Sequence, residues 1–285
     1  MAFADLRFRN VPCKTISLER IQEFIEDTHT KRICFAYAHQ NALRSVEDQN
    51  IAGWLNLPFD DPFEAIARSA LQMDKVLFPP KSGATYYRRI DSSEEYEKMA
   101  HFVEEIRDLV FLRDCLDLSV ALSMHESAPN ERTVLGNHEY KVKYCANKTD
   151  VKDDMDCLID EMQKWLEWLP YYKLADHICA IPSNNPFMRD VISGLHGFGF
   201  SDISEQVHWN NKQGSLKDVE TASGKLRMVQ SWNLLIDTDL SGKNVILVDD
   251  MYQSGVTMQY VAMKMKEAGA KRVFGMALVK SLSNQ

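Results

Sequence analysis

Two adjacent aspartates, Asp249 and Asp250, end an apolar run in the stretch VILVDDMYQSGVT at residues 245–257. The four apolar residues read as a buried strand, and the short polar turn after the aspartates leads into a helical pattern. A helix that begins after such a turn presents backbone amides and its positive dipole end, which suit a phosphate group. Ser254 and Thr257 would add hydroxyl donors, and Gly255 would keep a side chain out of the phosphate's space.

Carboxylates beside a phosphate site would repel the phosphate, so we expect them to hold another part of the same molecule. Vicinal sugar hydroxyls, or a magnesium ion attached to a diphosphate, are suitable partners. A sugar that carries a 5-phosphate and vicinal hydroxyls meets both requirements at once.

The elements around this stretch predict how it is positioned. From residue 176 onward, short apolar strands alternate with helices of 10–14 residues, which is typical of a parallel sheet covered on both faces. Ligands of such sheets bind at the carboxyl ends of the strands. We predict strands at 176–182, 205–209, 244–250 and 271–281, and helices at 186–197 and 256–269.

The segment before this alternation has two predicted elements. The sequence RTVLGNHEYKVKY at 132–144 reads as a β-hairpin that turns at Gly136 and Asn137. An apolar stripe with a spacing of three to four residues predicts a long helix at 151–169, which Pro170 ends.

The first half of the chain contains no motif with recognisable chemistry. It reads as mixed α/β, with helices expected at 17–27 and 93–113, extended segments at 32–38 and 83–89, and an acid-rich turn at 58–62. We predict a division near residue 130. Residues 1–130 would form a region of unknown role, either a hood over the site or a partner domain, and residues 131–285 the α/β domain with the parallel sheet.

Composition excludes several classes of function. The formal charge of −8 and the pI near 5.5 argue against broad nucleic-acid or anionic-membrane binding, although a local basic patch stays open. The six cysteines are scattered without a C-x-x-C pair, which indicates reduced thiols. No run approaches the ~18 apolar residues of a membrane span, and no secretory signal is visible. We therefore expect a cytoplasmic protein.

The stretch at 245–257 resembles the phosphoribosyl diphosphate (PRPP) binding motif of type I phosphoribosyltransferases, and AGAKRVFGMALVKS resembles the segment that closes their core domain. The resemblance implies that Asp249 and Asp250, as the catalytic residues, hold the ribose hydroxyls and that the loop binds the 5-phosphate. It implies these PRPP-binding residues: Asp249, Asp250, Met251, Tyr252, Gln253, Ser254, Gly255, Val256 and Thr257. The turn after the first strand is expected to receive the diphosphate: Pro182, Ser183, Asn184 and Asn185.

Two further segments resemble one divergent branch of the family. EYKVKYCAN at 139–147 is similar to the Lys-Tyr element of the ComF-like proteins, which are related to amidophosphoribosyltransferases, and SGKNVILVDD at 241–250 is similar to the same branch. The Arg-Gly-Phe-Asn-Gln element of the family is replaced by PFMRDVISGLHGFGF, which leaves Arg189 as its cation.

Cations between the second and third strands are candidates for a hood over the site that neutralises a departing diphosphate; solvated surface lysines are the alternative reading. They are Lys212, Lys217, Lys225 and Arg227. Gln253 stands where hypoxanthine-guanine phosphoribosyltransferases have an aspartate that assists proton removal. Because glutamine is not a base, salvage of 6-oxopurines is disfavoured.

The sequence thus predicts a phosphoribosyltransferase-like protein that transfers phosphoribosyl from PRPP to a nitrogen nucleophile and releases diphosphate. The acceptor is not identified, and Mg²⁺ would arrive with PRPP without a dedicated protein cage.

A non-catalytic PRPP or nucleotide sensor on the same fold, with a regulatory or defence role, is the alternative. A purely structural α/β protein would leave the acid pair without a purpose. Residues 1–130 are candidates for a homodimer or partner-protein contact.

Overall fold

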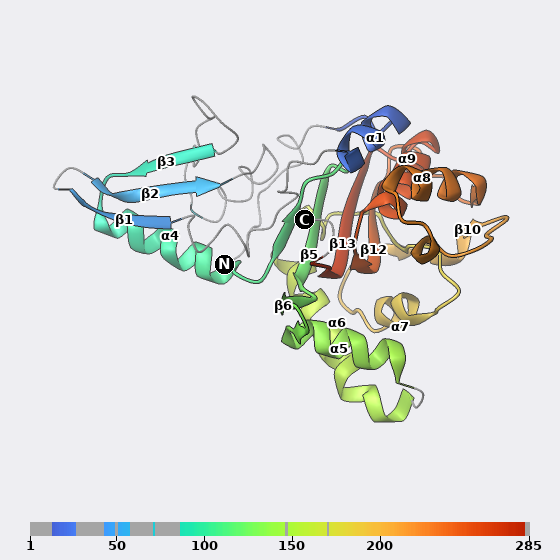
Figure 1. The fold of residues 1–285 in the computed structure, drawn as a ribbon, viewed down its shortest axis with the longest axis horizontal. Helices are drawn as coiled ribbons and strands as arrows, with labels where there is room; N and C mark the ends of the chain where they lie inside the picture. Colours follow the sequence, from blue (N-terminus) through green and yellow to red (C-terminus); the bar gives the residue numbers. More distant parts are fainter. Residues whose placement is uncertain are drawn as a thin grey trace.

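The computed structural model describes residues 13–26, 43–48, 51–57, 71, 86–145, 148–169 and 171–282 (Figure 1). The segment expected to be extended at 32–38 and the acid-rich turn at 58–62 lie outside the described residues. None of the described helices combines the length and the apolar character needed to cross a bilayer.

A six-stranded sheet forms the centre of the molecule, and its parallel character is as predicted. All neighbouring strands run parallel except the first pair, which is antiparallel. In spatial order the strands are β4 (Val110–Leu112), β5 (Leu118–Met124), β13 (Arg272–Lys280), β12 (Asn244–Tyr252), β8 (His177–Ala180) and β9 (Ser201–Asp202).

Helices cover both faces of this sheet (Figure 1). Successive side chains of a strand point to opposite faces, so Ile246 and Val248 pack in one core cluster while Val245 and Leu247 pack in the other. The first cluster is covered by α6 (Lys152–Trp168) and α7 (Phe187–Ser193). The second is covered by α1 (Leu18–Glu26), α8 (Ala222–Ser231) and α9 (Val256–Glu267). The predicted helices at 17–27, 151–169 and 256–269 are therefore confirmed, and that at 186–197 is shorter than expected.

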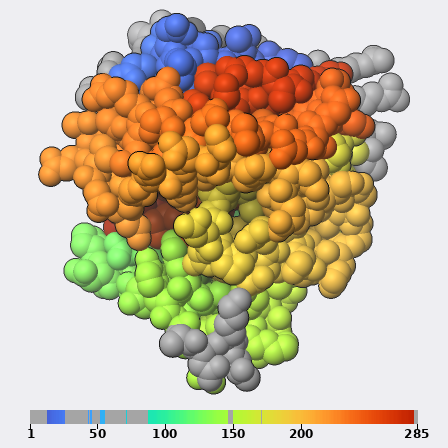
Figure 2. Space-filling model, turned by 90° about the vertical axis from the view of Figure 1, so that its right-hand side faces the viewer, coloured from blue at the N-terminus to red at the C-terminus, as the bar shows by residue number. Residues whose placement is uncertain are grey.

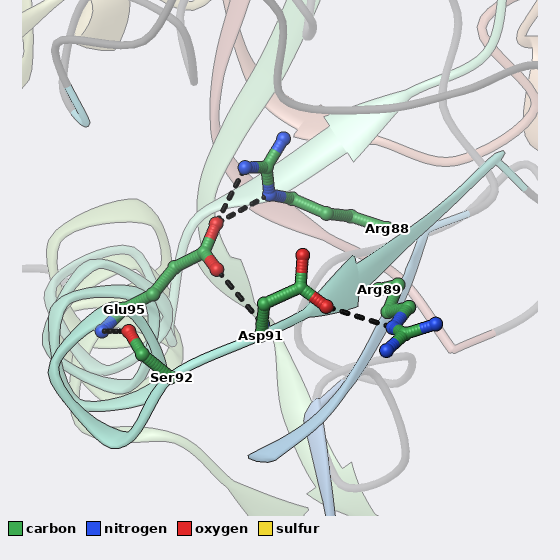
Figure 3. Close-up of polar contacts among 5 residues, drawn as sticks. All are labelled: Arg88, Arg89, Asp91, Ser92 and Glu95. Carbon is green, nitrogen blue, oxygen red and sulfur yellow. Dashed lines mark hydrogen bonds and ion pairs between the residues drawn. The ribbon is translucent and has the colours of Figure 1, made fainter. Parts of the chain in front are cut away.

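A separate antiparallel sheet lies at the other end of the molecule, at the left of Figure 1. Its strands are β1 (Leu43–Asp48), β2 (Ile51–Leu57) and β3 (Tyr86–Ile90), and α4 (Ser93–Glu105) follows them. The hydroxyl of Ser92 caps α4 by accepting a hydrogen bond from the backbone of Glu95, whose carboxylate pairs with Arg88 at 2.5 Å (Figure 3). These contacts join β3 to α4. The predicted helix at 93–113 was too long, because residues 110–112 form β4.

The central sheet takes strands from both sides of residue 130. β5 is buried along its whole length and pairs with β13, with Val120 opposite Met276. This strand was not predicted from the sequence, because a fully buried strand has no regular alternation of polar and apolar residues. The division near residue 130 stays a prediction.

Residues 134–144 form a helix, α5 (Val134–Tyr144), so the predicted hairpin at 132–144 was wrong. The Thr133 hydroxyl caps the helix by accepting a hydrogen bond from the backbone of Gly136 at 3.0 Å. Leu135 and Glu139, four residues apart, are buried on one side. A Cβ at Gly136 would collide with the backbone of His125. This glycine therefore permits close packing of the helix and does not form a turn.

The predicted strand at 205–209 forms in part, as β10 (Val207–Trp209), but it does not belong to the parallel sheet. It pairs antiparallel with β11 (Leu234–Ile236), and the outer position of the main sheet belongs to β9. The remaining short elements are β6 (Glu126–Ala128), β7 (Glu131–Arg132), η2 (Lys148–Val151), η3 (Ser204–Gln206) and η4 (Leu216–Asp218).

Candidate functional site

Two neighbouring parallel strands, β8 and β12, end at the same edge of the sheet. The backbone N–H of Ile181 still donates to the carbonyl of Val248 at 2.8 Å, so the strands remain together up to this edge. The turn at 182–185 follows β8 and leads into α7, and the turn at 253–255 follows β12 and leads into α9. The two predicted ligand loops are thus neighbours, as the parallel arrangement requires.

A cavity of about 550 Å³ opens between these loops. Figure 2 views this side of the molecule, where a hollow separates the orange segments after β9 from the yellow segment around α7. Among the described residues, the cavity lining lies entirely between Ala180 and Thr257. The predicted site residues that line it are Pro182, Ser183, Asn184, Asn185, Arg189, Lys212, Lys217, Asp249, Asp250 and Thr257.

The acid pair is held asymmetrically. The backbone N–H of Asp250 donates to Asp249 Oδ1 at 3.0 Å, and Asp250 Oδ2 lies 2.6 Å from the ammonium of Lys143. Within the described part of the chain, the second oxygen of each carboxylate, Asp249 Oδ2 and Asp250 Oδ1, has no hydrogen-bond partner. Burial, and then the charge of Asp250, raise the pKa of Asp249 well above its ordinary value. Each aspartate therefore has one oxygen fixed by the protein and one left for a ligand.

Lys143 is a site residue that the sequence analysis did not single out. It comes from α5 and pairs with Glu139 as well as Asp250, at 3.2 Å from Glu139 Oε1. Burial alone would lower the pKa of Lys143, but the two carboxylates together raise it above its ordinary value. The only sequence signal for Lys143 was the similarity of EYKVKYCAN to a family element. The predicted hairpin at 132–144 did not indicate in which direction the Lys143 side chain points.

The loop after the acid pair packs against a buried tyrosine, Tyr252. β12 continues to Tyr252, whose side chain is 2% exposed and whose hydroxyl donates to Asp114 Oδ2 at 3.1 Å. Gly255 then adopts a φ of +69° as the N-cap of α9. A Cβ at Gly255 would collide with the Tyr252 ring and hydroxyl. The expectation that Gly255 leaves room for a phosphate is therefore corrected, since the space that it leaves is filled by Tyr252.

The other predicted loop residues differ in accessibility. Met251, Ser254 and Thr257 are partly exposed, Gln253 is exposed and Val256 is buried. The first backbone N–H groups of α9 have no partner within the helix, as at any helix start. Residues 255–257 can therefore present backbone donors, whereas the side chains of Tyr252 and Val256 face the core.

The segment between β9 and α8 covers one side of the cavity. The indole N–H of Trp209 donates to the carbonyl of Pro182 at 2.9 Å, which ties this cover to the loop after β8. The ammonium of Lys212 lies 5.3 Å from the centre of the Trp232 ring; burial lowers its pKa, although Asp249 opposes this. The guanidinium of Arg189 pairs with Glu205 at 2.5 Å. Lys225 and Arg227 lie on α8, outside the residues that line the cavity.

Few of the described side chains near the cavity could contribute to a metal site. In the part of the chain that the structure describes, no three His, Cys, Asp or Glu side chains gather as a metal cage. Magnesium keeps most of its waters and is often held through substrate phosphates. The carboxylates of Asp249 and Asp250 at the cavity are oxygen ligands of the kind that magnesium takes.

Comparison with known proteins finds a similarity in the C-terminal part of this chain. Residues 176–284 match the family model "Phosphoribosyl transferase domain", which supports a phosphoribosyltransferase. No curated protein matches the chain.

Three of the solved structures that match are phosphoribosyltransferases of the hypoxanthine group. Hypoxanthine-guanine-xanthine phosphoribosyltransferase has 17% identity and a TM-score of 0.30, over 45% of this chain and 65% of that one. A hypoxanthine phosphoribosyltransferase from Staphylococcus aureus has 13% identity and a TM-score of 0.31, over 47% and 75%. An alanine mutant from a study of an invariant aspartic acid in HPRTs has 13% identity and a TM-score of 0.31, over 51% and 68%. The chain covers slightly less than two thirds of the first of these proteins.

Proposed function

We propose that this protein is a phosphoribosyltransferase that binds PRPP with magnesium and transfers the phosphoribosyl group to a nitrogen nucleophile. The observation that carries the proposal is the acid pair at the edge of the cavity. Asp249 Oδ2 and Asp250 Oδ1, unpartnered among the described residues, are two acceptors suited to two vicinal hydroxyls. The start of α9 and the turn at 182–185 flank the same cavity and suit the two phosphate ends of PRPP.

In the proposed reaction the bond between the anomeric carbon and the diphosphate breaks as the nitrogen bonds to that carbon, and diphosphate leaves with the bonding electrons. Because the transition state resembles an oxocarbenium ion, catalysis depends on positioning and on charge neutralisation. Asp249 and Asp250 orient the ribose, and the amides at 253–257 hold the 5-phosphate. The turn at 182–185 and the cations Lys212 and Lys217 receive the diphosphate. Magnesium carried by PRPP would reduce the charge of this leaving group.

The acceptor would enter beside the aromatic cover. Trp209 and His208 line the cavity close to the turn at 182–185. We assign no general base, because Gln253 at the loop position cannot accept a proton. Membership of the ComF-like branch, a cytoplasmic location, and a homodimer or partner contact through residues 1–130 remain part of this proposal.

The test is calorimetry with PRPP and Mg²⁺, followed by a screen of nitrogenous bases for release of diphosphate. Asp250→Asn should weaken PRPP binding by about 1–3 kcal/mol, because an amide is a weaker acceptor for sugar hydroxyls than a carboxylate. Asp237→Asn, at an exposed position on the same protein, is the matched control. Unchanged PRPP affinity in the double variant Asp249→Asn/Asp250→Asn would exclude this site as the PRPP site.

The second candidate is a PRPP or nucleotide sensor without turnover. The pairing of Arg189 with Glu205 favours it, since a paired guanidinium is less available to neutralise a leaving diphosphate. A sensor would bind PRPP in the same calorimetric experiment but release no diphosphate with any acceptor. Arg189→Gln separates the two: it should slow turnover of an enzyme and leave the response of a sensor nearly unchanged.

A further inference from the structure

Negatively and positively charged side chains alternate between α5 and the acid pair. Lys143 Nζ lies 2.6 Å from Asp250 Oδ2 and 3.2 Å from Glu139 Oε1. The other oxygen, Glu139 Oε2, lies 3.5 Å from His125 Nε2. The two carboxylates that share the ammonium differ in surroundings: Asp250 faces the cavity, whereas the side chain of Glu139 has no exposed surface.

Glu139 depends on Lys143 for compensation of its charge. Among the described residues, neither oxygen of Glu139 has a well-aligned hydrogen bond, and its side chain has no surface exposed to bulk solvent. Burial lowers the pKa of His125, so the imidazole is disfavoured as a second cation. A buried carboxylate that pairs with one ammonium fixes that ammonium in position. Glu139 therefore anchors Lys143.

Lys143 in turn limits how Asp250 can turn. The carboxylate of an aspartate rotates over a broad, roughly two-fold range when nothing holds it. The short charge-assisted contact at Oδ2 selects one orientation, and in it Oδ1 is the oxygen without a partner among the described residues. Lys143 is not among the residues that line the cavity, whereas Asp250 is, so we expect Lys143 to act on a ligand through Asp250.

We propose that Lys143 is a positioning residue, anchored by Glu139, that holds Asp250 in the orientation in which its second oxygen receives a ribose hydroxyl. The inference rests on the proposed function, because it takes the acid pair as the ribose site. It adds to the site two residues of α5 that lie outside the matched domain at 176–284.

The experiment compares two variants in the full chain. Lys143→Met leaves Glu139 buried without its cation, so we expect both lower thermal stability and a rise of roughly tenfold in the Kd for PRPP. The double variant Glu139→Gln/Lys143→Met removes the buried charge as well. It should regain most of the thermal stability while its affinity for PRPP stays low. Lys141→Met is the matched control, since Lys141 lies on the same helix and pairs with Asp154 at 3.1 Å, and it should change neither quantity appreciably.

Calorimetry with PRPP and Mg²⁺ and a thermal melt distinguish the outcomes. If the double variant regains PRPP affinity together with stability, Lys143 serves only to neutralise Glu139 and the inference is overturned. If the unaltered protein does not bind PRPP, the proposed function fails and the inference falls with it. Weak PRPP binding in a stable double variant, next to normal binding in Lys141→Met, is the expected result.

Discussion

The hydroxyl of Tyr252 lies 3.1 Å from Asp114 Oδ2, although 138 positions separate the two residues in the chain. Asp114 is 4% exposed and also accepts hydrogen bonds from Ser119 Oγ and from the backbone N–H of Leu116. Tyr252 in turn fills the space beneath Gly255. The turn between β4 and β5 thus supports the loop that we assign to the 5-phosphate.

Tyr252→Phe should lower the free energy of unfolding by about 1–2 kcal/mol, because it removes a hydrogen bond from a buried carboxylate. Denaturant unfolding measures this change. Tyr260→Phe is the control: within the described residues its hydroxyl has no hydrogen-bond partner, although the ring is buried. Equal losses in the two variants would show that the contact with Asp114 contributes nothing specific.

The stability of the protein should depend on pH through Asp114. Burial raises the pKa of this carboxyl above its ordinary value, with Lys14 and the hydrogen bonds opposing. Its contribution to stability is therefore fully present below the unfolded value of ~3.9 and is lost as pH rises through the raised folded value. Asp114→Asn should flatten this part of the stability curve, measured by denaturant unfolding from acid to neutral pH. An unaltered curve would contradict the assignment.

Gly255→Ala should reduce both stability and PRPP affinity. The φ of +69° costs an L-residue about 1–2 kcal/mol, and the added Cβ also displaces Tyr252. Gly242→Ala isolates the first effect, because Gly242 has a φ of +73° and an added Cβ there meets nothing within 4 Å. The excess loss in Gly255→Ala over Gly242→Ala measures the collision with Tyr252. No excess would mean that the loop adapts freely.

Trp209→Phe should weaken PRPP binding roughly tenfold with a smaller effect on stability, because it releases the carbonyl of Pro182 from the indole N–H. Binding calorimetry with PRPP and Mg²⁺ tests this. Trp165→Phe on α6 also removes an indole hydrogen bond, to Glu161 at 2.6 Å, but neither of these residues lines the cavity. PRPP affinity should fall in the first variant only.

Local pattern was sufficient to predict the unit from β12 through α9 to β13. An apolar strand, a turn with glycine and a helix that ends before Gly269 are each encoded within a few residues. Because the strands alternate with helices, the position of the turn at 182–185 beside the acid pair also followed from the sequence. The structure places all four of its residues at the cavity.

Long-range contacts could not be predicted in the same way. The alternation of Tyr, Val and Lys in 140–144 favours a strand. The cap at Thr133 and the burial of Leu135 and Glu139 on one side stabilise a helix instead. Lys143 reaches Asp250 only because of that helix. The contact between Asp114 and Tyr252 depends on a strand, β5, whose uniformly buried sequence has no periodicity to reveal it.

Because β5 pairs with β13, the central sheet cannot be completed until β13 has been synthesised. Asp117, just before β5, accepts a hydrogen bond from the backbone of Val273, which is 156 positions later in the chain. During synthesis β5 can pair with β4 at once, but its second neighbour, β13, does not exist until the chain has been made as far as residue 280. Contacts between such distant segments form slowly and leave unpaired edges exposed in the meantime. We expect the newly made chain to associate with chaperones until β13 inserts between β5 and β12.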